Sequence, residues 1–147
     1  MSTARKKQLR LFLRLLLVVT LCFIWGNSLL SRAESAALSG RVAAWLRSIG
    51  IPVGEHFLRK LAHFTEFGIL GCEITLLLRL KGKKGLQNLC YSALAAFFAA
   101  AADETLQVFS GRSGRLSDVL LDFCGAMTGI LLCTLITALA EKKHGPL

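Results

Sequence analysis

The stretch GLQNLCYSALAAFFAAAADETLQVFSGRSGRLSDVLLDFCGAMTGILLCTLITALA, residues 85–140, joins two apolar runs through a short polar block. Neither residues 85–102 nor residues 123–140 contain a charged side chain. As a helix, each run would span roughly 27 Å at about 1.5 Å per residue, which is close to the hydrocarbon thickness of a bilayer. The stretch therefore predicts two transmembrane helices joined by a polar connection.

Two further apolar runs precede this stretch. Residues 15–30 are uncharged, whereas residues 61–80 are interrupted by His63 and a few charged side chains. The chain has 147 residues and is 54% hydrophobic, which is too apolar for an ordinary soluble domain. We therefore expect an all-α fold, a small transmembrane four-helix bundle that forms one membrane domain over residues 1–147. The helices are expected at about 11–30, 57–80, 85–109 and 117–140.

The first run is longer than the core of a usual signal peptide, so we expect it to remain as a helix. Basic side chains collect at the ends of the predicted helices, in residues 5–14, 79–84 and 142–143. Four spans place these three segments on one side of the membrane, and the positive-inside bias predicts that this side, with both termini, is cytoplasmic. The net charge of +9 is not gathered on one face, which argues against nucleic acid as a partner.

The segment after the first run has a periodicity of its own. Apolar side chains recur there at spacings of three and four, namely Leu38, Val42, Trp45, Leu46 and Ile49. Gly50 and Pro52 then end the segment. This pattern predicts a short amphipathic helix that lies in the membrane interface with Trp45 as an anchor. A loop helix packed on the bundle is the alternative.

Polar side chains occupy matching places in three of the predicted helices, near the end of the bundle opposite the termini. Helical spacing places Arg59, His63 and Glu66 on one face, and it places Asp118 and Asp122 on one face of the last helix. The loop between the last two helices adds two arginines, so the full set is Arg59, His63, Glu66, Asp103, Glu104, Gln107, Arg112, Arg115, Asp118 and Asp122. Ionisable side chains inside a membrane usually face the bundle interior or a wet cavity. We therefore predict a polar cavity open to the outside.

The order and spacing of these residues carry a family resemblance. The elements are His63 with Glu66 and Phe67; Asp103, Glu104 and Gln107; Gly111 with Arg112; and Asp118 followed by Gly125 and Gly129. In this order they resemble the VanZ-like family of bacterial membrane proteins. Phe67 stands where the family often has tyrosine, and Asp122 stands where asparagine is frequent. The serine-rich element that follows the first helix in the family has Asn27, Ser28 and Ser31 as its counterparts here.

The resemblance implies a bacterial envelope protein, from a family named for resistance to the glycopeptide teicoplanin. One hypothesis is a recognition module whose cavity binds an amphiphilic envelope molecule, such as a lipid-linked cell-wall precursor, or the glycopeptide itself. The residues expected to bind it are Arg59, Gln107, Arg112, Arg115 and Asp122. Paired hydrogen bonds from arginine would hold carboxylate or phosphate groups.

The alternative is an intramembrane enzyme that acts on a lipid-linked or cell-wall substrate. Its acid, base or metal-ligand residues would be His63, Glu66, Asp103, Glu104 and Asp118. The sequence identifies no cofactor and leaves the presence of a metal open. A small transporter is a second alternative, in which Glu73 is the one acid placed deeper in the membrane. In a purely structural reading, the acids pair with Arg59, Lys60 and the two loop arginines to hold the helix ends together.

Overall fold

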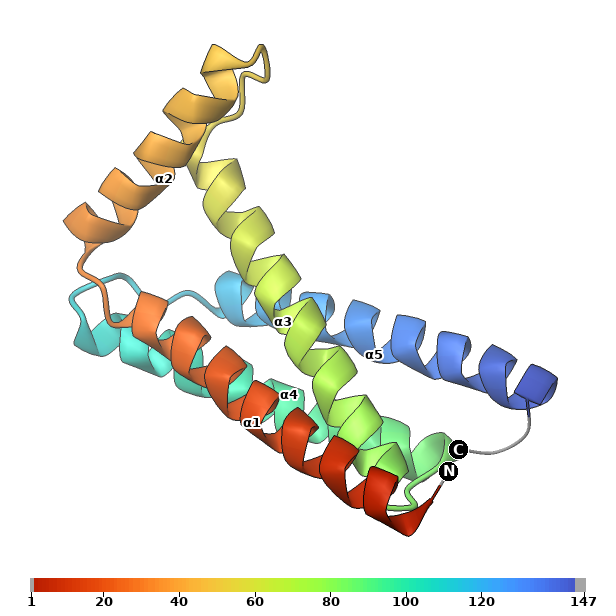
Figure 1. The fold of residues 1–147 in the computed structure, drawn as a ribbon. Helices are drawn as coiled ribbons and strands as arrows, with labels where there is room; N and C mark the ends of the chain where they lie inside the picture. The colour runs from red at the N-terminus through yellow and green to blue at the C-terminus, as the bar shows by residue number, and fades with distance from the viewer. Residues whose placement is uncertain (1, 145–147) are drawn as a thin grey trace.

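The computed structural model describes residues 2–144, which form five helices (Figure 1). The helices are α1 (Thr3–Ser28), α2 (Arg32–Ser48), α3 (Glu55–Leu80), α4 (Gly85–Phe109) and α5 (Leu116–His144). Residues 2–144 contain no strand. All helices except α2 are long and apolar enough to cross a membrane. The predicted all-α class with four membrane-spanning helices is therefore confirmed.

Two helices extend further than the apolar runs that predicted them. α1 begins at Thr3 rather than near residue 11, with Ser2 accepting a hydrogen bond from the backbone N–H of Arg5 at 3.3 Å. α5 continues to His144 rather than ending near residue 140. In both cases the added residues include lysine, which is a good helix former but contributes nothing to an apolar run. Hydropathy therefore located the membrane-spanning parts and missed the polar ends.

α2 confirms the predicted helix between the first two spans. Its N-terminus has a capping box, in which the Ser31 side chain accepts from the Glu34 N–H at 3.3 Å and the Glu34 carboxylate accepts from the Ser31 N–H at 2.9 Å. Beyond its C-terminus, Gly50 has a φ of 84°, a conformation that glycine adopts without strain. The predicted apolar stripe is exposed except for the half-buried Leu46, and Trp45 is 62% accessible. α2 and the first turns of α3 project beyond the other helices (Figure 1).

α3 lies at the centre of the bundle and contacts each of the other helices. Its closest approach is to α5, where glycine faces backbone. A methyl group built on Gly129 would overlap with the carbonyl oxygen of Gly68, and one built on Gly71 would overlap with that of Ala126. Glycine at these positions allows the two backbones to touch, as small residues do in membrane helix pairs.

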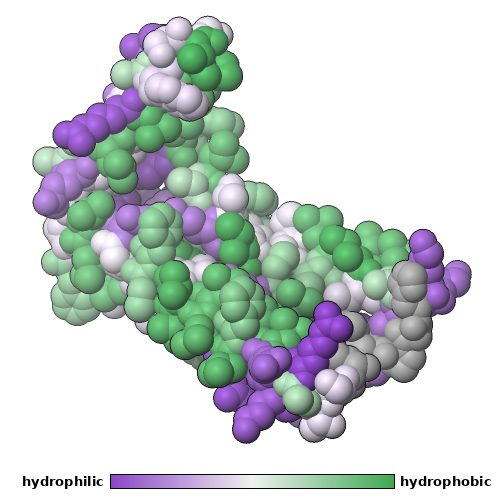
Figure 2. All heavy atoms as spheres, viewed as in Figure 1, coloured by the Kyte–Doolittle hydropathy of each residue, from purple (hydrophilic) through white to green (hydrophobic). Residues whose placement is uncertain are grey.

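The apolar core lies between these helices and consists of Ile24, Phe67, Leu70, Ala96, Ala100, Val119, Ala126 and Ile130. Outside it, apolar side chains cover much of the visible face of the helices (Figure 2). Hydrophilic side chains gather beside α2 and at the opposite end, near the start of α1 and the end of α5 (Figure 2). This distribution is that of a multi-pass membrane protein, with polar groups near the two ends and an apolar surface between them.

Candidate functional site

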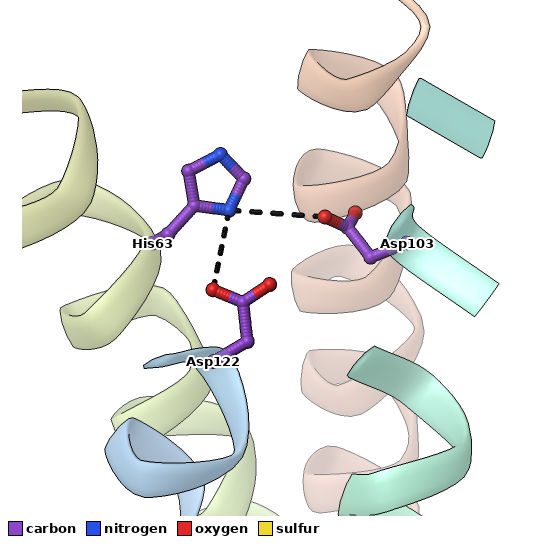
Figure 3. A group of neighbouring side chains, drawn as sticks. All are labelled: His63, Asp103 and Asp122. Atoms are coloured by element: carbon purple, nitrogen blue, oxygen red, sulfur yellow. Dashed lines mark ion pairs between the residues drawn. The ribbon is translucent and has the colours of Figure 1, made fainter. Parts of the chain in front are cut away.

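Three helices bring one histidine and two aspartates together within the bundle. His63 comes from α3, Asp103 from α4 and Asp122 from α5, and their side chains face one another (Figure 3). The Nδ1 atom of His63 lies 3.7 Å from an Asp103 carboxylate oxygen and 3.6 Å from an Asp122 carboxylate oxygen. Asp103 is 0% exposed and Asp122 is 1% exposed. Below, these three residues are called the His-Asp-Asp cluster.

Asp103 is held in place by donors from two helices. The Ser28 hydroxyl at the end of α1 donates to one carboxylate oxygen at 2.6 Å, and the Gln107 amide donates to the other at 2.8 Å. The Ser110 hydroxyl donates to the Ser28 carbonyl at 2.9 Å, which ties the end of α1 to the end of α4. These bonds fix the orientation of the Asp103 carboxylate toward the cluster.

Asp122 has no such support. Both of its carboxylate oxygens are buried without a hydrogen-bond partner among the described residues, and so is Nδ1 of His63. Buried polar atoms are nearly always hydrogen-bonded, because an unmade bond costs about 1–3 kcal/mol and more for a charged group. The unpartnered atoms lie on facing side chains, so the cluster has the capacity to bind something further.

A polar cavity of about 60 Å³ opens beside the cluster. It is lined by His56, Arg59, Lys60, His63, Gln107, Arg112, Asp118, Leu121 and Asp122. Lys60 and Asp118 form an ion pair of 3.9 Å there, and their side chains are 42% and 33% exposed. A volume of this size has room for a few water molecules on one side of the cluster.

Arg112 reaches this cavity from the α4–α5 loop. The Glu104 carboxylate holds the loop by accepting a hydrogen bond from the Arg115 N–H at 2.5 Å. Gly111 has a φ of 77° at the start of the loop. Burial lowers the pKa of the Arg112 guanidinium, and the neighbouring Arg59 lowers this pKa further. Two arginines that repel each other in this way favour an anion between them.

A larger apolar groove of about 680 Å³ adjoins the polar cavity. Residues of α1, α2 and α3 line it, and Leu38 and Val42 come from the exposed stripe of α2. Arg59, His63 and Arg112 line both the groove and the polar cavity. The two spaces therefore meet at these three side chains.

The structure separates the sequence-predicted residues into distinct places. Glu66 lines the apolar groove and is absent from the lining of the polar cavity. Glu104 holds the loop, and the exposed Arg115 lines neither space. Asp118 lies at the ion pair rather than in the His-Asp-Asp cluster. Asp122, expected as a binding residue, lies with His63 in that cluster.

Ser28, His56, Lys60 and Leu121 were not among the predicted site residues, although Ser28 bonds to the cluster and the other three line the polar cavity. Ser28, identified only as a counterpart of a family serine, bonds directly to Asp103. His56 lines the polar cavity, and its spacing of seven residues from His63 was a signal for the same helix face. The deeper Glu73 accepts a hydrogen bond from Thr20 at 2.9 Å and lines neither space.

The helices and the buried cluster define a helical multi-pass membrane protein with a polar site at one end of its bundle. A family model described as VanZ/LLP1 matches residues 9–137. The chain belongs to this family, as the resemblance in the sequence predicted. No match was found among curated proteins or among solved structures.

Proposed function

We propose that the protein binds an amphiphilic envelope molecule with an anionic headgroup. The observation that carries this proposal is the junction of a polar cavity with an apolar groove at Arg59, His63 and Arg112. An amphiphile needs both kinds of space, joined at the point where its headgroup meets its chain. Arginine at that point suits phosphate or carboxylate, because its planar guanidinium donates paired hydrogen bonds.

The groove accounts for the lipid part of the ligand. Its volume of about 680 Å³ falls within the usual range of about 300–1,000 Å³ for small-molecule sites. The lining contains Leu38 and Val42 of α2 and Phe23 of α1. α2 would then lie in the membrane interface, as its exposed apolar stripe suggests, and would cover the chain of the ligand.

The charge pattern supports an outward-facing site in a bacterial cell membrane. Basic residues near the start of α1, in the α3–α4 loop and at the end of α5 favour a cytoplasmic position for both termini. The cluster lies at the opposite end of the bundle, which would then face the outside of the cell. Cell-wall precursors and glycopeptides would be able to reach it from that side. A tag at the C-terminus should therefore resist protease added to intact cells, and cleavage of that tag would contradict this orientation.

Labelling in lipid nanodiscs tests the binding proposal. The protein is placed in neutral phosphatidylcholine and exposed to a photoreactive polyprenyl phosphate or to the matching polyprenol. We expect the phosphate to label the protein more strongly than the alcohol. Arg112→Gln should weaken phosphate binding by about tenfold or more, since a hydrogen bond to a charged group contributes about 1.5–3 kcal/mol.

Arg115→Gln is the matched control, because Arg115 lies on the same loop and lines neither space. It should leave phosphate labelling unchanged. Equal labelling by the phosphate and the alcohol, or equal loss in the two variants, would refute the proposal. In cells that depend on the protein for teicoplanin tolerance, Arg112→Gln should lower tolerance at an unchanged protein level, and Arg115→Gln should not.

An intramembrane enzyme is the second candidate, favoured by the unpartnered Nδ1 of His63 beside two carboxylates at a polar cavity. In this reading His63 acts as a general base and activates water toward a lipid-linked substrate in the groove. His63→Gln would then abolish release of the headgroup while the lipid still bound. Absence of any released headgroup from the unmodified protein would exclude this role for the substrate tested.

A further inference from the structure

We infer that His63, Asp103 and Asp122 form a binding site for one divalent transition-metal ion, with Zn²⁺ as the preferred ion. The three side chains offer one imidazole nitrogen and two carboxylate oxygens, and these atoms all lie within 4.8 Å of one another. Imidazole and carboxylate are both ligands that Zn²⁺ accepts, and the nitrogen favours Zn²⁺ over Mg²⁺.

The distances suit an ion between the side chains. A Zn–ligand bond of about 2.1 Å with tetrahedral angles places neighbouring ligand atoms about 3.4 Å apart. The separations from His63 Nδ1 are 3.7 Å to Asp103 and 3.6 Å to Asp122, close to this value, and the two aspartate oxygens lie within 4.8 Å of each other. Nδ1 faces both carboxylates, and the other ring nitrogen points away from them (Figure 3).

Asp122 provides an independent indication of a ligand. It is 1% exposed and faces the cluster, yet neither carboxylate oxygen has a hydrogen-bond partner among the described residues. A buried carboxylate without donors is stabilised either by a proton or by a compensating positive charge. No lysine or arginine lies within ion-pair distance of Asp103 or Asp122 in residues 2–144, and Lys60 is paired with Asp118 instead. A divalent cation would balance the two aspartates.

The surroundings of Asp103 are those of a supported metal ligand. Its carboxylate accepts from Ser28 at 2.6 Å and from Gln107 at 2.8 Å. Hydrogen bonds of this kind orient a ligand before the metal arrives, and their loss typically costs about 10–100-fold in metal affinity. The polar cavity is lined by His63 and Asp122, so water or a ligand group would have access to a fourth coordination position.

Protonation within the cluster, of His63 or of one aspartate, is the competing explanation, and metal measurement distinguishes it. The full chain, with any histidine tag removed, is stripped with chelator in detergent and titrated with Zn²⁺ in competition with a chromophoric chelator. We expect about one Zn²⁺ per chain, weaker binding of Mn²⁺ and very weak binding of Mg²⁺. The Co²⁺ form should show d–d bands without thiolate charge-transfer bands, which excludes the cysteines as ligands.

Asp122→Asn should lower Zn²⁺ affinity by at least tenfold, and Ser28→Ala by about 10–100-fold. Asp118→Asn is the matched control on the same helix and should lower the affinity by much less than Asp122→Asn, because Asp118 lines the adjoining cavity but is not among the three ligand residues. If Asp122→Asn does not fold, judged by its helical signal and its elution volume, His63→Gln replaces it. Substoichiometric Zn²⁺, or equal loss in Asp118→Asn and Asp122→Asn, would overturn the inference.

The metal site does not depend on the amphiphile proposed above. Arg112→Gln should reduce lipid-phosphate labelling while the chain still binds about one Zn²⁺, because Arg112 is not among the three ligand residues. Failure of the lipid experiment with intact Zn²⁺ binding would remove the proposed function only. Failure of the Zn²⁺ titration with intact labelling would remove only the metal site.

Discussion

Replacement of Gly125 by alanine tests whether the close crossing of α3 and α5 sets the geometry of the site. Gly125 lies three residues after Asp122, and it packs against the backbone of Phe64, the residue after His63. An added methyl carbon would lie 3.0 Å from both the carbonyl carbon and the Cα of Phe64, and closer still to its carbonyl oxygen. The obstacle is backbone, which cannot rotate out of the way as a side chain could.

The size of the effect follows from these distances. Ordinary carbon–carbon contacts are about 3.5–4.0 Å, so the helices must separate by about 0.5–1 Å at this point. A gap of that size loses about a quarter to a half of each van der Waals contact along the seam. Overpacking of this kind costs about 1–3 kcal/mol, and the upper part of that range applies to a backbone obstacle. The same shift would widen the 3.6 Å separation of His63 and Asp122.

Equilibrium unfolding in mixed micelles, followed by loss of helical signal, measures the stability change. Gly26→Ala in α1 is the control, because a methyl group there would meet nothing within 4 Å and alanine favours a helix. We expect Gly125→Ala to lower the free energy of unfolding and to weaken Zn²⁺ binding, with neither loss in Gly26→Ala. A Gly125→Ala variant as stable as the unmodified chain would refute the argument from backbone contact.

Three further predictions concern the residues that support the site. Ser28→Ala removes a donor to Asp103 and should lower the free energy of unfolding by about 1.5–3 kcal/mol in the same assay; an unchanged value would mean that this bond contributes nothing. Glu104→Ala removes the carboxylate that holds the α4–α5 loop, so limited proteolysis should cut this loop faster; equal cleavage would contradict that role. Hydrogen bonds from Ser31 lower the pKa of Glu34, so the capping box of α2 should be complete above the ordinary glutamate pKa of 4.5 and should be lost as the pH falls through the lowered value. Ser31→Ala should return the Glu34 pKa toward 4.5 in an NMR titration, and an unmoved value would exclude the cap as its cause.

The membrane-spanning helices could be predicted because each contains a long apolar run, and hydropathy alone identifies such runs. The positions of the polar residues on helix faces followed from spacing. Spacing alone could not predict that Asp122, rather than Asp118, lies beside His63, since both aspartates lie on one face of α5. That choice depends on how far α5 is displaced along α3, which the contact of Gly125 with Phe64 sets. A single sequence has no signal for this displacement.

The same limit applies to Asp103 and Glu104. Neighbouring residues on a helix point about 100° apart, so only one of them can face His63. The packing of Ala96 and Ala100 in the core rotates α4 so that Asp103 faces inward, and Glu104 is left to hold the loop. The apolar groove was also beyond sequence reasoning, because α1, α2 and α3 form it together and its shape depends on the angle of α2.

The structural reading of the polar residues, in which the acids pair with bases to hold helix ends, does not account for this arrangement. Of the ion pairs that it requires, only Lys60–Asp118 forms within residues 2–144, at 3.9 Å and partly exposed, where such a pair contributes about 0–1 kcal/mol. Asp122 costs stability where it lies, because its buried oxygens have no donor. The glycine contacts between α3 and α5, at Gly68, Gly71, Gly125 and Gly129, do not involve the side chain at position 122. Together with the apolar core, they would hold the two helices together equally well if residue 122 were apolar. An acid that opposes folding and lines the polar cavity is best explained by what it binds.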